Sequence, residues 1–228
     1  MINATLVIPV FNEEDNIGEL ITSIKVQEIV PEHVIFVDAG STDNTAKCIR
    51  TLVGNDNRFS IIEAGPAMPS KARNIGAASV TNEWIAFTDA GVTQKKDWLE
   101  NLVKKAKQNP EAEVIYGNVS PRTNNFFEEC AAIAYMPPLK SGIIRAKSIA
   151  TCLLRKYVWE KVGGFPDFRA AEDLIFIDNV EKAGFKTAYC YEAMIYWHLC
   201  PDLISTFKKF LLYSKHNVWA GRQSGWHY

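Results

Sequence analysis

The first half of the chain alternates short runs of β-branched residues with amphipathic stretches, and this pattern limits the fold more than any other feature of the sequence. Such alternation is typical of parallel strands joined by crossover helices. We expect strands at 4–10, 33–37, 59–62, 84–88 and 114–116, and helices at 16–27, 44–52, 70–80 and 97–108. After residue 117 the pattern loosens, then resumes with a strand near 149–155, a helix from 156 and a helix near 172–183. The sequence therefore predicts an α/β fold with a mostly parallel central sheet flanked by helices.

Length, charge and cysteine content narrow the classes of function. With 228 residues the chain fits one domain with one main site. Its formal net charge of -1 provides no general excess of positive charge for nucleic acid, so any phosphate must be held by local groups. The 5 cysteines lack C-x-x-C spacing, which argues against a disulfide framework or a zinc cluster. Without a signal-like leader or an apolar run of roughly 20 residues, we expect a soluble cytoplasmic protein.

Polar motifs follow the first two expected strands, at the sheet edge where loops converge on a crevice. The run from Pro9 through Phe11 to Glu13 can form the edge of a pocket, with the ring near a base and the carboxylate near ribose hydroxyls. The alternative is that these acids only complement a helix dipole. Asp38 ends the second strand and can accept a hydrogen bond from a base N–H. For Asp43, a helix cap is the better explanation.

Two further motifs accompany the next helix and strand. Lys71 and Arg73 lie in the first turn of an expected helix, where cations oppose the macrodipole, so we expect an anionic ligand beside them. A solvated basic turn is the alternative. Asp89 ends a buried strand at the point where a D-x-D pair would hold a divalent metal through oxygen ligands. Gly91 replaces the second aspartate, so at most one of the two carboxylates is present.

The second half contributes two more candidates. Glu172 and Asp173 follow a G-G-F motif and open a helix whose dipole stabilises them, but Asp173 can equally serve as a general base. His198 lies next to Trp197 and can supply a nitrogen ligand to a divalent ion, with core packing as the alternative.

Taken in order, P-x-F-N-E, V-D-A-G-S-T-D, A-R-N-x-G, T-D-A-G, G-G-F followed by E-D, and W-H resemble the motifs of family-2 glycosyltransferases with the GT-A fold. The likeness runs from about residue 5 to about residue 216. It implies a Rossmann-like GT-A sheet in a single domain, 1–228, with a nucleotide-binding half at 1–118 and a smaller half at 119–228 for the acceptor and the catalytic base. It also implies inverting transfer of a hexose-type sugar from a UDP- or GDP-linked donor to a glycan or lipid-linked acceptor.

The resemblance also implies roles for individual residues. The side chains that would line the nucleoside are Pro9, Phe11, Glu13, Asp38 and Arg73. Asp89 would lie near the ribose, the diphosphate and a Mn or Mg ion, with His198 as a second metal ligand. Lys71 or Arg73 would help to stabilise the charge on the diphosphate, and Asp173 would be the catalytic base. Gly91 departs from the family pattern and puts the metal in question.

Two other functions and the acceptor side remain open. A sugar-phosphate nucleotidyltransferase explains the first half of the chain but not the late E-D and His pair. An inactive sugar-nucleotide-binding module would explain the lost aspartate but not Asp173. We expect the acceptor against residues 120–148, where Tyr135, Met136 and Leu139 face a lipid or glycan or pack in the core. The protein would then associate peripherally with the inner face of the cell membrane.

Overall fold

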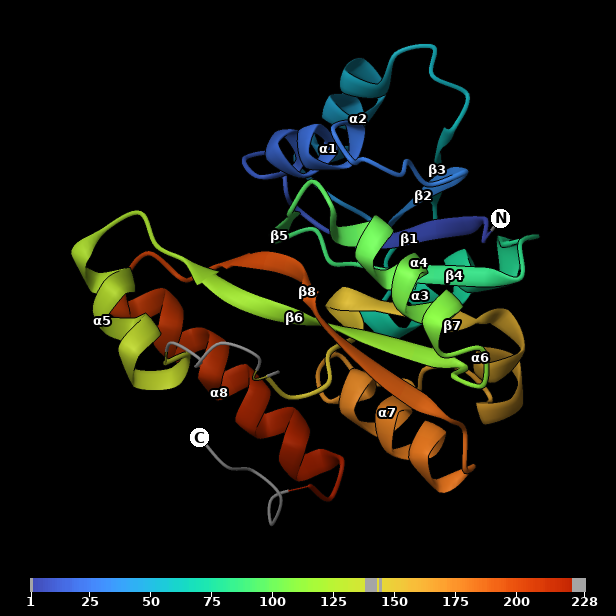
Figure 1. Cartoon of the computed structure of the whole chain (residues 1–228). Helices are drawn as coiled ribbons and strands as arrows, with labels where there is room; N and C mark the ends of the chain where they lie inside the picture. The colour runs from blue at the N-terminus through green and yellow to red at the C-terminus, as the bar shows by residue number, and fades with distance from the viewer. Residues whose placement is uncertain (1, 138–142, 144, 223–228) are drawn as a thin grey trace.

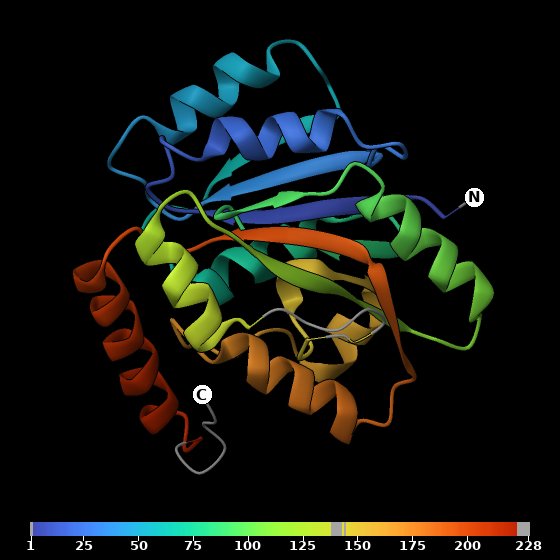
Figure 2. The same cartoon turned by 60° about the vertical axis from the view of Figure 1, so that its left-hand side comes forward.

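A single twisted sheet forms the centre of the molecule. The computed structural model describes residues 2–137, 143 and 145–222, so Leu139 lies outside the described residues. Eight strands lie in the order β3-β2-β1-β4-β7-β6-β8-β5, with helices on both faces of the sheet (Figures 1 and 2). This arrangement confirms the predicted α/β class.

Parallel pairing dominates the N-terminal part of the sheet. Its strands are β1 (Ala4–Val10), β2 (His33–Asp38), β3 (Phe59–Glu63) and β4 (Trp84–Phe87). β1 pairs in parallel with both β2 and β4, and β2 pairs in parallel with β3. The chain order therefore reverses beside β1, which is where loops at the carboxyl ends of such strands leave a crevice for ligands.

The C-terminal strands extend the sheet with mixed directions. They are β5 (Val92–Gln94), β6 (Val114–Arg122), β7 (Cys152–Arg155) and β8 (Thr187–His198). β6 and β8 are parallel, whereas β7 is antiparallel to β4 and β6, and β5 is antiparallel to β8. Four of the seven neighbouring pairs are thus parallel, so the prediction of a mostly parallel sheet is confirmed.

Eight α-helices and one 3₁₀ turn connect the described strands. The helices are α1 (Ile17–Lys25), α2 (Thr45–Val53), α3 (Pro69–Ser79), α4 (Trp98–Gln108), α5 (Phe126–Tyr135), α6 (Lys156–Val162), α7 (Glu172–Lys182) and α8 (Leu203–Trp219), and the 3₁₀ turn is Ile149–Thr151. Within the described ranges, no helix has both the length and the hydropathy needed to cross a lipid bilayer.

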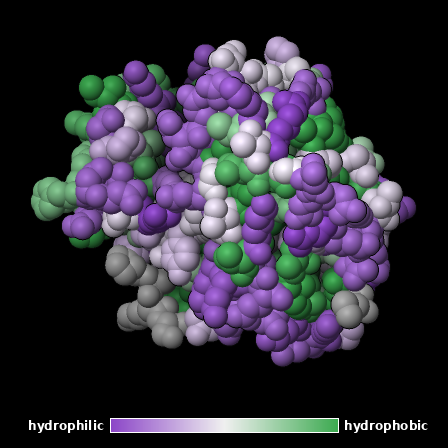
Figure 3. Space-filling model, turned by 90° about the horizontal axis from the view of Figure 1, so that it is seen from above, coloured by the Kyte–Doolittle hydropathy of each residue, from purple (hydrophilic) through white to green (hydrophobic). Residues whose placement is uncertain are grey.

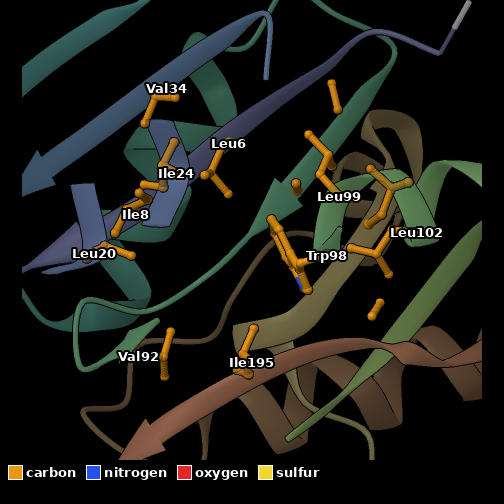
Figure 4. Close-up of a cluster of buried hydrophobic side chains, with 14 of the residues drawn as sticks. Leu6, Ile8, Leu20, Ile24, Val34, Val92, Trp98, Leu99, Leu102 and Ile195 are labelled. Carbon is orange, nitrogen blue, oxygen red and sulfur yellow. The ribbon is translucent and has the colours of Figure 1, made fainter. Parts of the chain in front are cut away.

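Each face of the sheet has its own hydrophobic core. The core under α1 and α4 contains Leu6, Ile8 and the fully buried Trp98 (Figure 4). The indole Nε1 of Trp98 donates a hydrogen bond to Thr151 Oγ1 at 2.9 Å, so this large side chain leaves no unpaired donor inside the core. The other core lies under α3, α6 and α7.

The close contact between α3 and β1 positions the site. A Cβ at Gly76 would overlap the Val7 side chain and lie 3.0 Å from Val37, so only glycine lets the helix lie this close to the sheet. The first turn of α3 is therefore held beside the carboxyl end of β1. Ala72 and Ala77 are buried at the same contact, as their small size predicts.

Helix starts differ in detail from the prediction. The helix expected at 70–80 begins one residue earlier, at Pro69, whose fixed φ suits the first helical position. The N-cap of α2 is Asn44 rather than the predicted Asp43, but Asp43 Oδ1 accepts a hydrogen bond from the Thr45 backbone N at 2.9 Å and so satisfies one N–H of the first turn. β5, α5, β8 and α8 were not among the elements predicted from the sequence.

Candidate functional site

A cavity of about 570 Å³ opens at the carboxyl ends of β1, β2 and β4, at the reversal of strand order. Its size is typical of a small-molecule site. The lining side chains that carry polar or charged groups are Glu13 after β1, Arg73 on α3, Asp89 after β4, Arg169, Glu172 and Asp173 at the start of α7, and Lys209, Tyr213 and Asn217 on α8. The fold thus brings together groups from both halves of the chain.

Most of the predicted site residues line this one cavity. Pro9, Phe11 and Glu13 come from the end of β1 and the loop that follows it. Arg73, Asp89 and Asp173 complete the predicted set that the structure brings together. Phe11 keeps 43% of its surface exposed, so its ring is accessible to a ligand.

A buried arginine joins the two halves of the site. The Arg73 guanidinium donates to Asp89 Oδ1 at 2.6 Å and to Glu172 Oε1 at 2.6 Å, through two different nitrogens. The Arg73 and Glu172 side chains are each only 6% exposed. A planar guanidinium can hold two carboxylates in fixed directions, which an ammonium cannot do as well. Arg73 therefore ties α3, the loop after β4 and the start of α7 together.

The pKa values at this site are shifted by burial and by crowding of carboxylates. Burial raises the pKa of Glu172 to about 7, although Arg73 opposes the shift. Burial also raises the pKa of Asp173, again against the influence of Arg73. Burial alone would lower the pKa of Arg73, but Asp89, Glu172 and Asp173 outweigh it and raise that pKa. Asp173 is consequently a better proton acceptor than an ordinary aspartate.

The backbone is strained where α7 begins. Ala171 has a φ of 72°, a left-handed conformation that costs free energy for a residue with a Cβ. This residue directly precedes Glu172 and Asp173 and also lines the cavity. The Oδ1 atom of Asp173 accepts a hydrogen bond from the Leu174 backbone N at 2.8 Å. The strained turn thus sets the direction in which the two carboxylates leave the helix.

Asp38 lies behind the cavity wall. Its side chain is buried, and its Oδ1 accepts a hydrogen bond from the Ser41 backbone N at 2.9 Å, while its neighbour Ala39 lines the cavity. The loops after β1 and β2 are also joined, because Asn12 Oδ1 accepts from the Thr42 backbone N at 2.8 Å. In this structure Asp38 therefore holds the loop that forms part of the wall.

Lys71 and His198 do not line the cavity. Lys71 is exposed on α3. The His198 backbone N donates to Gly91 O at 3.3 Å, but its ring Nε2 lies 3.3 Å from Arg122 Nη1 and 3.6 Å from Glu19 Oε2. Burial lowers the pKa of His198, and Arg122 adds to the shift.

The side chains of the described residues do not form a site for a divalent cation. No group of three or more His, Cys, Asp or Glu residues is arranged to hold a metal in that part of the chain. The Asp89 carboxylate is already paired with Arg73, and Gly91 supplies no second ligand. Asp89 is paired with Arg73, whereas the His198 ring lies against Arg122 and Glu19, so the role of these two residues as metal ligands stays a prediction.

The contribution of α8 to the cavity was not predicted from the sequence. Lys209, Leu212 and Tyr213 line the cavity. Leu212 and Tyr213 follow Lys209 by three and four residues, so the three side chains share one helical face. That interval was the available signal. This spacing was hard to recognise in the sequence because α8 also has large apolar residues on its exposed face. Together with the cavity-lining residues they form what looks like one apolar run interrupted by lysines.

A family profile identifies the protein family of this chain. The profile described as Glycosyl transferase family 2 matches residues 5–148, well over half of the chain. The chain belongs to glycosyl transferase family 2. The match includes Arg73 and Asp89, whereas Asp173 and α8 lie beyond it.

Individual relatives agree with this family assignment. The O-antigen chain rhamnosyltransferase RfbN of Salmonella typhimurium is 27% identical over 84% of this chain, which spans 65% of that protein. Two solved structures share the fold with a TM-score of 0.70: S. aureus TarS 1–349 in complex with UDP-GlcNAc, and the mannosyltransferase PcManGT of Pyrobaculum calidifontis in complex with GDP-Man and Mn2+. They are 17% and 20% identical to this chain, cover 88% and 97% of it, and are spanned by it over 60% and 64% of their lengths. The predicted family and GT-A fold are confirmed.

Replacing Arg73 with alanine should lower the free energy of unfolding by about 3–5 kcal/mol at pH 8, because Glu172 and Asp89 lose their counter-ion. The loss should be smaller at pH 5. Burial raises the pKa of Glu172 from its ordinary value of 4.5 to about 7. Glu172 therefore contributes fully to the free energy of unfolding below pH 4.5, and this contribution is lost as the pH rises towards about 7. Without Arg73 to oppose burial, this dependence on pH should become steeper.

Urea unfolding of the wild type and the variant at both pH values measures the difference. Arg73→Lys keeps a positive charge but cannot span both carboxylates, so it should lie between the two proteins. Equal losses at pH 5 and pH 8 would mean that Arg73 acts only by filling space.

Proposed function

We propose that this member of family 2 transfers a sugar from a nucleotide-diphosphate sugar to an acceptor hydroxyl, with inversion at the anomeric carbon. The observation that carries the proposal is the cavity itself, where Asp89 and Asp173 face one space from separate elements. Residues 1–118 supply the donor side, and residues 119–228 supply the base and the acceptor side. The family assignment favours transfer over the nucleotidyltransferase and binding-module alternatives.

In this proposal Asp173 is the general base. Its carboxylate takes the proton of the acceptor hydroxyl, and the acceptor oxygen attacks the anomeric carbon. The bond from that carbon to the diphosphate breaks, and its electron pair leaves with the phosphate oxygen. A single displacement needs the base and the leaving group on opposite sides of the sugar. The raised pKa of Asp173 supports this role, because it brings the group closer to the pH at which a base works well.

For the donor, we propose a UDP- or GDP-linked sugar whose nucleoside lies against Pro9, Phe11 and Glu13. The accessible Phe11 ring supports stacking with a base, and Glu13 offers a carboxylate near the ribose. Asp38 would act on the base directly or through the loop that it holds. TarS and PcManGT, which share the fold, were solved with UDP-GlcNAc and GDP-Man. We assign no step to a divalent cation, because the described side chains do not form a site for one.

Asp173→Asn should leave donor affinity within about twofold of the wild type and lower transfer by about 100- to 10,000-fold, because it removes the base and little else. Calorimetry with UDP and GDP gives the affinity. Release of either nucleotide from a panel of sugar nucleotides, with cell-envelope glycans as acceptors, gives the transfer rate. Glu181→Gln, on the outer face of the same helix, is the matched control. Unchanged turnover in Asp173→Asn would remove this residue from the mechanism.

We further infer that the acceptor is a glycan or a lipid-linked glycan and that the protein works peripherally at the inner face of the cell membrane. An apolar surface on α5 and α8 supports this inference: it consists of Phe126, Ile133, Ile204, Phe207 and Leu211, with exposed fractions of 59–79%. The two helices lie side by side, with the Tyr135 and Phe210 rings 5.3 Å apart (Figures 1 and 2).

The surroundings of this apolar surface fit a lipid bilayer with anionic head groups. Viewed from above, much of the surface is hydrophilic, and hydrophobic groups are visible at the edge where α5 lies as well as in patches elsewhere (Figure 3). The exposed Lys215 on α8 can meet an anionic lipid, and its Nζ lies 4.4 Å from the centre of the Trp219 ring. Apolar side chains next to a lysine and a tryptophan on one helix are typical of interfacial binding. Tyr135 and Met136 pack in the small core beside Leu199, so core packing explains both.

The variant Phe207→Ser with Leu211→Ser should weaken binding to vesicles of phosphatidylglycerol and phosphatidylcholine by more than about tenfold, because two exposed apolar side chains are lost. Flotation of wild type and variant measures the bound fraction. Calorimetry with UDP and GDP should show unchanged nucleotide affinity. A wild-type protein that stays off the vesicles would exclude this apolar surface as a membrane contact.

A further inference from the structure

The two cations that the family resemblance assigns to the diphosphate, Lys71 and Arg73, are placed differently from each other in this structure. The Arg73 guanidinium forms salt bridges with Asp89 and Glu172, and Lys71 does not line the cavity. Two other basic residues line the cavity, Arg169 in the loop before α7 and Lys209 on α8. Neither has a carboxylate within salt-bridge distance in the described part of the chain. A ligand with negative charge could therefore contact these two side chains without displacing a carboxylate.

We propose that Lys209 binds the diphosphate of the donor directly and neutralises the charge that grows on it when the sugar departs. The inference rests on the proposed function of the cavity and adds a specific residue to it. The ligand class is a nucleoside diphosphate, free or linked to a sugar. Arg169 lines the same cavity and is exposed, so it is suited to an assisting role.

The surroundings of Lys209 hold its ammonium group at the cavity wall. The Nζ atom lies 4.1 Å from the centre of the Trp197 ring and 5.9 Å from that of Tyr213, so the chain is directed by aromatic faces. Burial lowers the pKa of Lys209, while Cys200, Glu13 and Asp89 oppose that shift. Glu13 and Asp89 are thus close enough to attract the ammonium without pairing with it. A partly desolvated cation of this kind interacts strongly with an incoming anion.

Gly91 makes a direct contact between lysine and diphosphate more favourable. The second aspartate of a D-x-D pair would add a negative charge to this cavity and require a metal to offset it. With glycine in that place, the acidic wall has one carboxylate fewer, and Lys209 faces it from α8. Preorganised cations at the leaving group are an established way to stabilise transition-state charge.

Lys209→Met should weaken the affinity for UDP or GDP by about 10- to 100-fold, because a charge-assisted contact to phosphate is lost. The affinity for uridine or guanosine, which lack the diphosphate, should stay within about twofold. Lys208→Met is the matched control, since this lysine is exposed, adjacent in sequence and absent from the cavity lining, and it should leave both affinities unchanged. Lys209→Arg should recover most of the diphosphate affinity.

Calorimetry in the presence of chelator measures all of these affinities. Lys209→Gln, with a polar end that keeps the shape of the chain, provides a second neutral variant should Lys209→Met fail to fold. If the wild type binds diphosphates and both neutral variants bind them equally well, Lys209 is not the contact and only this inference fails. If the wild type binds no nucleoside diphosphate at all, the proposed function fails with it.

Discussion

The paired contact of Arg73 with Asp89 and Glu172 is the interaction on which the rest of the site depends. A buried guanidinium between two carboxylates is stable only while both partners stay in place, because either charge alone would be costly in the interior. Arg73 is held at that point by α3, which can lie close against β1 because Gly76 has no side chain. Packing of the sheet thus fixes the position of the acidic groups after β4 and at the start of α7.

The two halves of the chain contribute different parts of the site. The parallel strands β1, β2 and β4 contribute the loops at their carboxyl ends, which line the cavity on the side proposed for the donor. The second half adds Asp173 on α7 and Lys209 on α8, which line the same cavity. In the proposed mechanism, the carboxylate that accepts the proton and the ammonium that contacts the departing diphosphate are carried by separate helices, α7 and α8, which allows them to act on opposite sides of the sugar.

Much of the fold was predictable because buried parallel strands read as apolar runs and their crossover helices as amphipathic ones. β8 and α8 were missed because both leave large side chains exposed, which weakens any periodic pattern. The cavity residues after β1 and β4 followed from their places at strand ends. Arg73 and Glu172 are 99 positions apart, so sequence spacing gave no sign of their contact. The direction of the His198 ring was equally beyond a sequence argument.

A crystal structure of the protein with bound UDP or GDP would show directly where the nucleotide lies. We expect it in the cavity at the carboxyl ends of β1 and β4, with its base near Phe11 and its diphosphate between the Asp89 wall and α8. Asp173 should face the sugar-binding space from the opposite side. A nucleotide bound outside this cavity, or a diphosphate directed away from α8 and towards the surface, would contradict the account.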